Sequence, residues 1–213
     1  MPKAELPSLS LFLDILLKLE NLKIPYVVIG GFAATMYGIT RATFDIDIVV
    51  EMQENHIQAL ANAYPSPRYY ADPHQMRGAI QKGSSFNIID SSRGEKADLF
   101  PLAMDPRYRP AFENRVRRPV VLPEMEPFNV WAARPEDVII GKLMAWDEGR
   151  SERHSADIFE MILFRYLGGD ATAVTFNEAY VDKRAQEISQ EAAALWRLIK
   201  TAAREEADNA KPI

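Results

Sequence analysis

The sequence predicts an α+β fold in which a sheet-bearing N-terminal part is followed by a helical C-terminal part. The first observation is an uncharged β-branched run, Tyr26–Ile29, that ends in two glycines and leads into helix-forming residues. The others are two hairpin patterns between about residues 85 and 131 and helical composition from Pro135 onward. We therefore expect a core over residues 1–130 and a helical part over 131–213, either as two domains or as one continuous domain.

Composition limits the class of protein. The chain has 213 residues, of which 47% are hydrophobic, so a substantial core is expected. Cysteine is absent, which excludes disulfides and zinc–thiolate sites and favours a reducing cytoplasm. The net charge of −5 argues against a protein that coats nucleic acid. Leu9–Leu22 predicts an amphipathic packing helix rather than a signal peptide, and no stretch approaches the ~20 apolar residues of a membrane span.

The first strand is followed by Gly30-Gly31 and then by a short predicted helix over Phe32–Tyr37. Without side chains at the two glycines the backbone can approach a ligand closely, and free amides at a helix start attract phosphate. An isolated Gly-Gly pair is more commonly only a turn. The acidic strand that comes after it is what favours a phosphate site here.

The next strand, Asp45–Val50, carries two acids at alternating positions. Side chains alternate faces at about 3.3 Å per residue, so Asp45 and Asp47 share one face about 7 Å apart, while Ile46 and Ile48 face the core. Two ionised carboxylates on one face favour a cation between them, and oxygen ligands suit Mg²⁺ or Mn²⁺. An isolated Asp-x-Asp would more often be a solvated edge.

Arg41 and Thr43 stand just ahead of this strand, where a guanidinium and a hydroxyl can reach phosphate oxygens. Further on, helices are predicted over Asn55–Ala63 and from Asp72 or Pro73 to about Lys82. A hairpin is then predicted from Ser85–Asp90 and Lys96–Phe100.

An acid also lies inside this hairpin. Asp98 stands between Ala97 and Leu99, where an inward-facing carboxylate needs a partner or a metal, although an exposed edge position remains the alternative.

Arginines are concentrated between Asp105 and Arg118. This run contains five arginines and two acids, although the chain is acidic overall. The run predicts either a docking surface for triphosphate or RNA, or a solvated face or arginines that pair with the acidic remainder. The five residues are Arg107, Arg109, Arg115, Arg117 and Arg118.

A second hairpin, Arg118–Leu122 with Phe128–Trp131, leads into a predicted helix from Pro135 to about Trp146. Lys142 falls at the margin of the apolar stripe of this helix. Its stem can lie on apolar surface while the ammonium reaches water. Helices are also predicted over Glu178–Ile188 and Glu191–Glu206.

The combination of an apolar strand, Gly-Gly, a short helix and Arg-x-Thr-x-Asp-x-Asp over Tyr26–Val50 resembles the polymerase-β-type nucleotidyltransferase superfamily, in particular the branch of AbiEii-like toxins. The resemblance implies a mixed sheet flanked by helices and a metal-dependent transfer of a nucleoside monophosphate. Gly31 stands where many members have serine, which removes one hydroxyl contact to the phosphates.

The resemblance implies roles for individual residues. Asp45 and Asp47 would hold two magnesium ions about 3.5–4 Å apart. Asp98 would be the third carboxylate, a metal ligand that also helps deprotonate the attacking hydroxyl, with Asp90 as a weaker substitute.

Lys142-Leu-Met-Ala145 matches a Lys-Leu-x-Ala motif of the AbiEii-type branch, which implies that Lys142 contacts the nucleotide and that Asp157 orients it. Gly30, Gly31, Arg41 and Thr43 would complete the nucleotide-binding set. Arg150, Arg153 and His154 could extend a cationic rim, although His154 alone is more typical of a surface residue.

The resemblance also implies partners: a nucleoside triphosphate, an RNA (tRNA) or protein acceptor, and an antitoxin protein if the chain is the toxin of a toxin–antitoxin pair. The alternative is a module that keeps the fold, has lost the chemistry and binds nucleotide or a protein. Gly31 and the acidic net charge favour the module, whereas the full set of acids favours the enzyme.

Overall fold

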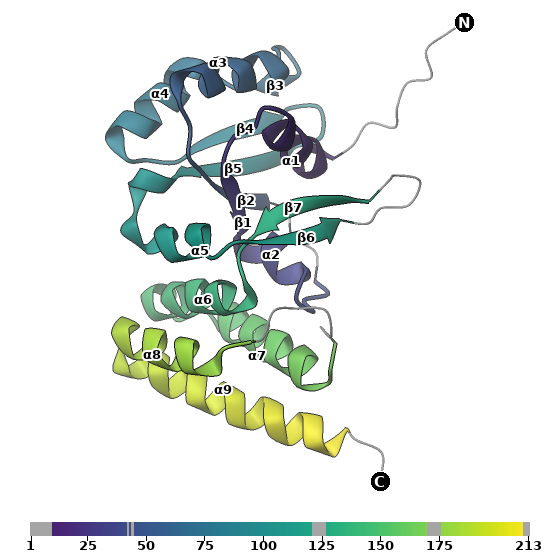
Figure 1. Cartoon of the computed structure of the whole chain (residues 1–213), viewed down its shortest axis with the longest axis vertical. Coiled ribbons are helices and arrows are strands. Elements are labelled where there is room, and N and C mark those ends of the chain that lie inside the picture. The colour runs from purple at the N-terminus through teal and green to yellow at the C-terminus, as the bar shows by residue number, and fades with distance from the viewer. Residues whose placement is uncertain (1–9, 42, 44, 121–126, 170–175, 211–213) are drawn as a thin grey trace, which may run out of the picture. The chain divides into compact units, whose positions relative to one another are not determined.

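The computed structural model shows two compact units, which we call the sheet unit and the helical unit (Figure 1). The described residues are 10–41, 43, 45–120, 127–169 and 176–210. The sheet unit comprises Met1–Val28, Thr43–Glu113 and Arg117–Trp131, and the helical unit comprises Ile29–Ala42, Asn114–Val116 and Ala132–Ile213. The domain division after residue 130 stays a prediction, because compactness alone does not show that a segment folds independently.

The sheet unit is built on a mixed sheet that has seven strands among the described residues, in the order β3-β4-β5-β2-β1-β7-β6. β2 pairs with β5 in parallel, while β4 is antiparallel to both β3 and β5. The predicted α+β fold is thereby confirmed. The strands are β1 (Tyr26–Ile29), β2 (Asp45–Val50), β3 (Tyr69–Tyr70), β4 (Phe86–Asp90), β5 (Glu95–Pro101), β6 (Val116–Val120) and β7 (Phe128–Ala132).

The central strands have one apolar face. Ile46 and Ile48 on β2 stand beside Ala97 and Leu99 on β5, and all four side chains are fully buried. Helix α1 (Leu11–Asn21) packs against β5, and α4 (Pro73–Lys82) packs against β4. Both helices also contact α3 (Glu54–Ala63). Burial of each Ile or Leu contributes about 1.5–3 kcal/mol, so this face anchors β2 and β5 in register.

The helical unit consists of helices that pack on one another, with α6, α7, α8 and α9 grouped together in Figure 1. α7 packs against α6 and α9, α8 packs against α6 and α9, and α2 packs against α6. The helices are α2 (Gly30–Thr35), α6 (Pro135–Gly149), α7 (Glu152–Tyr166), α8 (Glu178–Ile188) and α9 (Gln190–Asn209). The sheet unit also contains α5 (Arg109–Glu113) and short 3₁₀ turns at Leu102–Met104 and Pro106–Tyr108.

Local capping explains several boundaries. The Asp72 carboxylate accepts a hydrogen bond from the His74 amide at the start of α4, and Gly83 ends that helix with a φ of 64°. Ser189 caps α9 by accepting from the Ala192 amide at 2.9 Å. The helices predicted downstream of β2 are all present, and α6 continues beyond Trp146 to Gly149.

Two local features differ from the predictions. α2 begins at Gly30 rather than at Phe32, and the two-residue strand β3 was not predicted. Val121 and Leu122 of the predicted second hairpin lie outside the described residues, while β7 and β6 are neighbours in the sheet. No helix in the part of the chain that the structure describes is long and apolar enough to cross a bilayer.

Candidate functional site

The face of β2 opposite the apolar one carries the predicted pair of acids. Along β2, Ile46 and Ile48 are fully buried while Asp45 and Asp47 are half-buried. Strand alternation therefore places both carboxylates on one side, as predicted. We call Asp45, Asp47 and Asp98 together the acidic face.

The register of β2 and β5 adds the third acid. In the parallel ladder Asp47 stands directly beside Asp98, and Asp45 stands beside Lys96. Neighbours in a ladder project to the same face, so the four side chains form one polar patch on the sheet unit.

Both carboxylate oxygens of Asp98 are bonded within the sheet unit. Asn87 on β4 donates from Nδ2 to Oδ1 at 2.7 Å, and the Lys96 ammonium lies 2.7 Å from Oδ2. The hydrogen bond to Asp98 raises the pKa of Lys96, and the charges of Asp98, Asp45 and Asp47 raise it further. Lys96 is thus bonded to Asp98 and also interacts electrostatically with Asp45 and Asp47.

Thr43 supports Asp45. Its hydroxyl donates to Asp45 Oδ1 at 2.9 Å and lies 3.1 Å from the backbone oxygen of the same residue. The hydroxyl predicted to reach phosphate therefore orients a carboxylate in this structure.

The acidic face matches a hard divalent cation in chemistry. Three carboxylates on one face offer the oxygen ligands that Mg²⁺ and Mn²⁺ prefer. Within the described residues, no three His, Cys, Asp or Glu side chains are grouped tightly enough to hold a metal ion as they stand. Binding of one ion by all three acids therefore requires side-chain movement. Asn87 and Lys96, the partners of Asp98, are the side chains that would have to release it.

Asp90 lies on the other face of its strand and is not a substitute for Asp98. Asp90 is three positions from Asn87, so the two side chains project from opposite faces of β4. Asn87 is the ladder neighbour of Asp98, whereas Asp90 is almost fully buried. Arg68 donates to Asp90 Oδ2 at 2.7 Å, and Ser92 donates to Oδ1 from both its amide and its hydroxyl. These bonds, led by the one from Arg68, lower the pKa of Asp90 to about 2, so Asp90 is a structural anion of the turn.

Gly30 and Gly31 lie at the start of α2 in the helical unit. Gly30 has a φ of 65°, a left-handed conformation that favours glycine over any residue with a Cβ. Helix α2 has only six residues, so its dipole is short.

The structure brings together three other predicted residues, Arg41, Lys142 and Asp157, which we call the cationic cluster. All belong to the helical unit. Arg41 donates to both oxygens of Asp157, from Nε at 2.8 Å and from a terminal nitrogen at 2.6 Å. Lys142 Nζ donates to Asp157 Oδ2 at 2.5 Å.

The Lys142 ammonium does not reach water, contrary to the packing alternative. Lys142 is 6% exposed and Asp157 is 3% exposed, so the ion pair is buried. Burial lowers the pKa of Lys142, and the hydrogen bond to Asp157 offsets only part of that effect. Burial raises the pKa of Asp157, but the hydrogen bonds from Arg41 and Lys142 outweigh it, so the net shift is downward.

Two cations share one anion in this cluster, which gives it a net charge of +1 when all three groups are ionised. The partly buried His154 adjoins it, because Lys142 and Asp157 both act on its pKa, which burial lowers. His154 Nδ1 is buried and has no hydrogen-bond partner among the described residues. The net positive charge of the cluster therefore suits an anion.

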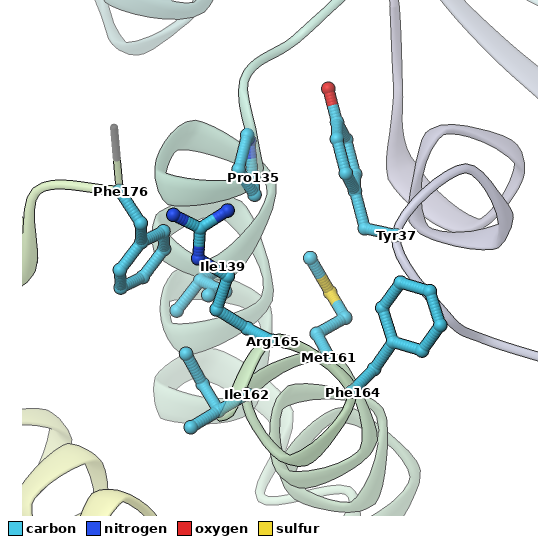
Figure 2. A pocket seen from close by; sticks show the side chains of 8 residues that line it. All are labelled: Tyr37, Pro135, Ile139, Met161, Ile162, Phe164, Arg165 and Phe176. Atoms are coloured by element: carbon cyan, nitrogen blue, oxygen red, sulfur yellow. The ribbon is translucent and has the colours of Figure 1, made fainter. Parts of the chain in front are cut away.

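A separate pocket of the helical unit is apolar (Figure 2). The Arg165 guanidinium and the Phe176 ring lie on one side of it, 5.9 Å apart, and Phe164 and Tyr37 lie on the other. The lining residues that the structure describes include none of the predicted site residues, so we assign the pocket no role in the site. They are Tyr37, Pro135, Ile139, Met161, Ile162, Phe164, Arg165 and Phe176.

Arg117 pairs with an acid outside the run from Asp105 to Arg118, as the second interpretation expected, whereas Arg107 and Arg109 pair with the two acids of the run itself. Arg117 lies 2.6 Å from Glu20 and stacks on Trp131 at 4.9 Å. Arg107 lies 2.7 Å from Asp105, and Arg109 lies 3.4 Å from Glu113. At least these three guanidinium groups already have acidic partners.

Sequence reasoning missed Lys96 and Asn87, whereas it had named His154 as a residue that could extend a cationic rim. Lys96 and Asp98 are two positions apart on a predicted strand, so the alternation that paired Asp45 with Asp47 also places these two on one face. The contact of Asn87 with Asp98 depends on the register of the hairpin, which the sequence alone does not specify. The position of His154 beside the cationic cluster depends on how the helices pack.

Comparison with known proteins gives a family for the chain and a related fold. Residues 11–211 match the family described as nucleotidyl transferase AbiEii toxin, type IV toxin–antitoxin system. An antigenic nucleotidyltransferase-like protein from Paracoccidioides brasiliensis has a similar structure, with a TM-score of 0.53 and 18% identity over 93% of this chain and 90% of that one. JHP933 from Helicobacter pylori gives a TM-score of 0.43 and 15% identity over 95% of this chain and 96% of its own. No curated protein matched the sequence.

Proposed function

This chain belongs to the family of AbiEii nucleotidyl transferase toxins of type IV toxin–antitoxin systems, and from that premise we propose that it transfers a nucleoside monophosphate from a nucleoside triphosphate to a hydroxyl acceptor. Membership confirms the resemblance of the Tyr26–Val50 motifs, and the enzyme class follows from the family. The metal, the residues that act and the acceptor are our proposal.

The acidic face supplies the chemistry in this proposal. Asp45, Asp47 and Asp98 would hold Mg²⁺ or Mn²⁺, which polarises phosphoryl oxygens and offsets charge when bound. The acceptor oxygen attacks the α-phosphorus, the bond to the bridging oxygen breaks, and pyrophosphate leaves with the electron pair. Asp98 takes the proton of the acceptor hydroxyl.

The cationic cluster supplies phosphate binding. Lys142 and Arg41 share one counter-ion, Asp157, so a phosphate oxygen would give the cluster the negative charge it lacks. Asp157 would hold both cations in place. Gly30 and Gly31 would let backbone amides approach the phosphates, and Thr43 would orient Asp45.

The observation that carries the proposal is the ladder register, which sets Asp47 beside Asp98 with Asp45 on the same face of the sheet unit. Like charges on one half-buried face repel one another, and a bound divalent cation would relieve that repulsion.

Thermal unfolding tests the binding step. Mg²⁺ plus a nucleoside triphosphate at about 100 times Kd is expected to raise Tm by roughly 5–10 °C, because the ligand binds only the folded state. Asp45→Asn should abolish this shift, while Lys82→Met on the exposed end of α4 should keep it. A parent protein whose Tm does not respond would contradict the proposal.

The acceptor would be an RNA, especially tRNA, or a protein. Incubation with each α-labelled triphosphate, total RNA and cell lysate, followed by separation, shows which fraction keeps the label. Asp45→Asn is the matched control. If the chain is the toxin of its pair, an antitoxin protein should reduce labelling.

A second candidate is a module that binds nucleotide or a protein partner without chemistry. Two observations favour it: Gly31 in place of serine, and the engagement of both Asp98 oxygens by Asn87 and Lys96. A Tm shift with triphosphate but no pyrophosphate release in the presence of any acceptor would select this candidate.

A further inference from the structure

Lys96 occupies a place on the acidic face that the proposed function does not explain. It stands beside Asp45 in the ladder, and its ammonium bonds to Asp98 at 2.7 Å. Lys96 is 45% exposed at its side chain, whereas Asp98 is 15% exposed. A cation on a flexible, accessible stem is thus held on a mostly buried carboxylate.

Lys96 already occupies one oxygen of a proposed metal ligand. Asp98 Oδ2 is bonded to the ammonium of Lys96, the ladder neighbour of Asp45, and Asp98 Oδ1 accepts a hydrogen bond from Asn87. A metal ion bound by all three carboxylates needs an oxygen of Asp98, and a divalent cation repels the ammonium at Oδ2. Such an ion would therefore compete with Lys96 for Asp98.

We propose that Lys96 is the exchangeable counter-cation of Asp98, bonded to it in the metal-free protein and displaced from it by the divalent ion. This rests on the proposed function. Lysine is suited to the role because its compact ammonium sits on a four-carbon stem that can turn outward without disturbing the strand. Arginine would hold a carboxylate through two bonds and exchange less readily.

The exchange has two opposite consequences for Lys96→Met. Without metal, the variant leaves the three carboxylates with no lysine among them, so its Tm should fall below that of the parent protein. With metal, no ammonium competes, so Mn²⁺ affinity should rise by roughly tenfold.

The experiment measures Mn²⁺ binding by titration calorimetry, with the electron paramagnetic resonance signal of free Mn²⁺ as a second readout. The proteins are the parent chain, Lys96→Met, Lys96→Arg, and Lys82→Met as the control on an exposed lysine. We expect tighter binding only in Lys96→Met, unchanged binding in Lys82→Met, and binding no tighter than the parent in Lys96→Arg.

A double-mutant cycle locates the competition at Asp98. In an Asp98→Asn background, Lys96→Met should gain much less Mn²⁺ affinity than it does in the parent background. An equal gain in both backgrounds would mean that Lys96 acts only through its general charge, and would overturn the exchange.

The remaining outcomes separate this inference from the proposed function. If the parent and Lys96→Met bind Mn²⁺ equally, the metal site stands and the exchange is wrong. If neither binds Mn²⁺ while both are folded, the metal-dependent function itself fails. Lys96→Gln is the replacement if Lys96→Met does not fold, with the same expected gain.

Discussion

At the scale of single residues, Asp157 is the anion that two cations of the helical unit share. One buried carboxylate accepts hydrogen bonds from Arg41 and Lys142, so removal of the anion and removal of a cation are not equivalent. A buried ion that loses its only partner is costly, whereas removal of a surplus like charge is not.

Asp157→Asn should therefore cost about 3 kcal/mol of unfolding free energy, because it leaves the buried Lys142 ammonium near the Arg41 guanidinium without a carboxylate between them. Lys142→Met should change that free energy by less than about 1 kcal/mol, since the Arg41–Asp157 pair remains. Urea unfolding of both variants measures the asymmetry. Similar losses in the two variants would show that Lys142 contributes to stability as much as Asp157 does.

The candidate site was predictable from sequence only where local rules apply. Alternation along a strand placed Asp45 and Asp47 on one face, and the same rule would have found Lys96 beside Asp98. The bond from Arg41 to Asp157 joins residues 116 positions apart, and no local pattern predicts it. Only the family resemblance linked Lys142 to Asp157.

At the scale of elements, the start of α6 carries a second buried aspartate of opposite character. The Tyr180 hydroxyl on α8 donates to Asp137 Oδ1 at 2.9 Å, and Arg134 lies 3.6 Å from Oδ2. Burial raises the pKa of Asp137, and these contacts offset only part of the effect. Its ionised form is therefore disfavoured in the folded protein.

A raised folded pKa means that the stabilising contribution of Asp137 is present below the unfolded pKa of about 4 and is lost as the pH rises through the raised value. Asp137→Asn should then be at least as stable as the parent at pH 7, with the difference vanishing near pH 3. Asp157→Asn, at a carboxylate with a lowered pKa, should show the reverse dependence. Denaturant unfolding across pH 3–8 checks both signs, and a loss in Asp137→Asn at pH 7 would contradict the first.

The turns after α2 and α7 meet at Phe164. A Cβ at Gly38, where φ is 102°, would lie 2.5 Å from Phe164 Cγ, and one at Gly169 would lie 2.3 Å from Phe164 Cε2. Gly38→Ala should cost about 2–4 kcal/mol, because it combines backbone strain with overlap. Thermal unfolding is the measurement.

Gly94→Ala is the matched control for Gly38→Ala. Gly94 also has a positive φ, 67°, but a Cβ there meets nothing within 4 Å of the described structure, so only about 1 kcal/mol is expected. Phe164→Leu should recover part of the Gly38→Ala loss if overlap is the cause. Equal losses at Gly38 and Gly94 would assign the whole cost to the backbone.

Element prediction succeeded where residues repeat a period over many positions and failed where they do not. α6 and α9 follow from their helical periodicity, and Pro135 marks the start of α6. β3 has two residues, Tyr69 and Tyr70, too few to show a period, and it exists because β4 supplies its partner. Long-range pairing created that strand.

At the scale of the whole molecule, the two units interleave along the chain. Residues 29–42 belong to the helical unit although the segments before and after them belong to the sheet unit. Ala33 and Ala34 of α2 are fully buried, and the Tyr37 hydroxyl donates to the Ala133 carbonyl at 2.7 Å. The part after residue 131 therefore completes the burial of an earlier segment.

A fragment of residues 1–131 should consequently lack cooperative unfolding, because α2 loses α6 and exposes apolar surface. Circular dichroism during thermal unfolding of the fragment, compared with the full chain, tests this. Mixing with a 132–213 fragment should restore cooperativity. A 1–131 fragment that unfolds cooperatively by itself would instead support a separate N-terminal domain.

The strand order has a consequence for association between chains. Of the described strands, β3 and β6 form the edges of the sheet; the first has only two residues, and the second contains Arg117, Arg118 and Pro119, whose ring nitrogen has no hydrogen to donate. Short, charged or proline-bearing edges resist the addition of a foreign strand. Fibril-like stacking through this sheet is therefore disfavoured, and strand addition at either of these edges is an unfavourable route for association with another protein.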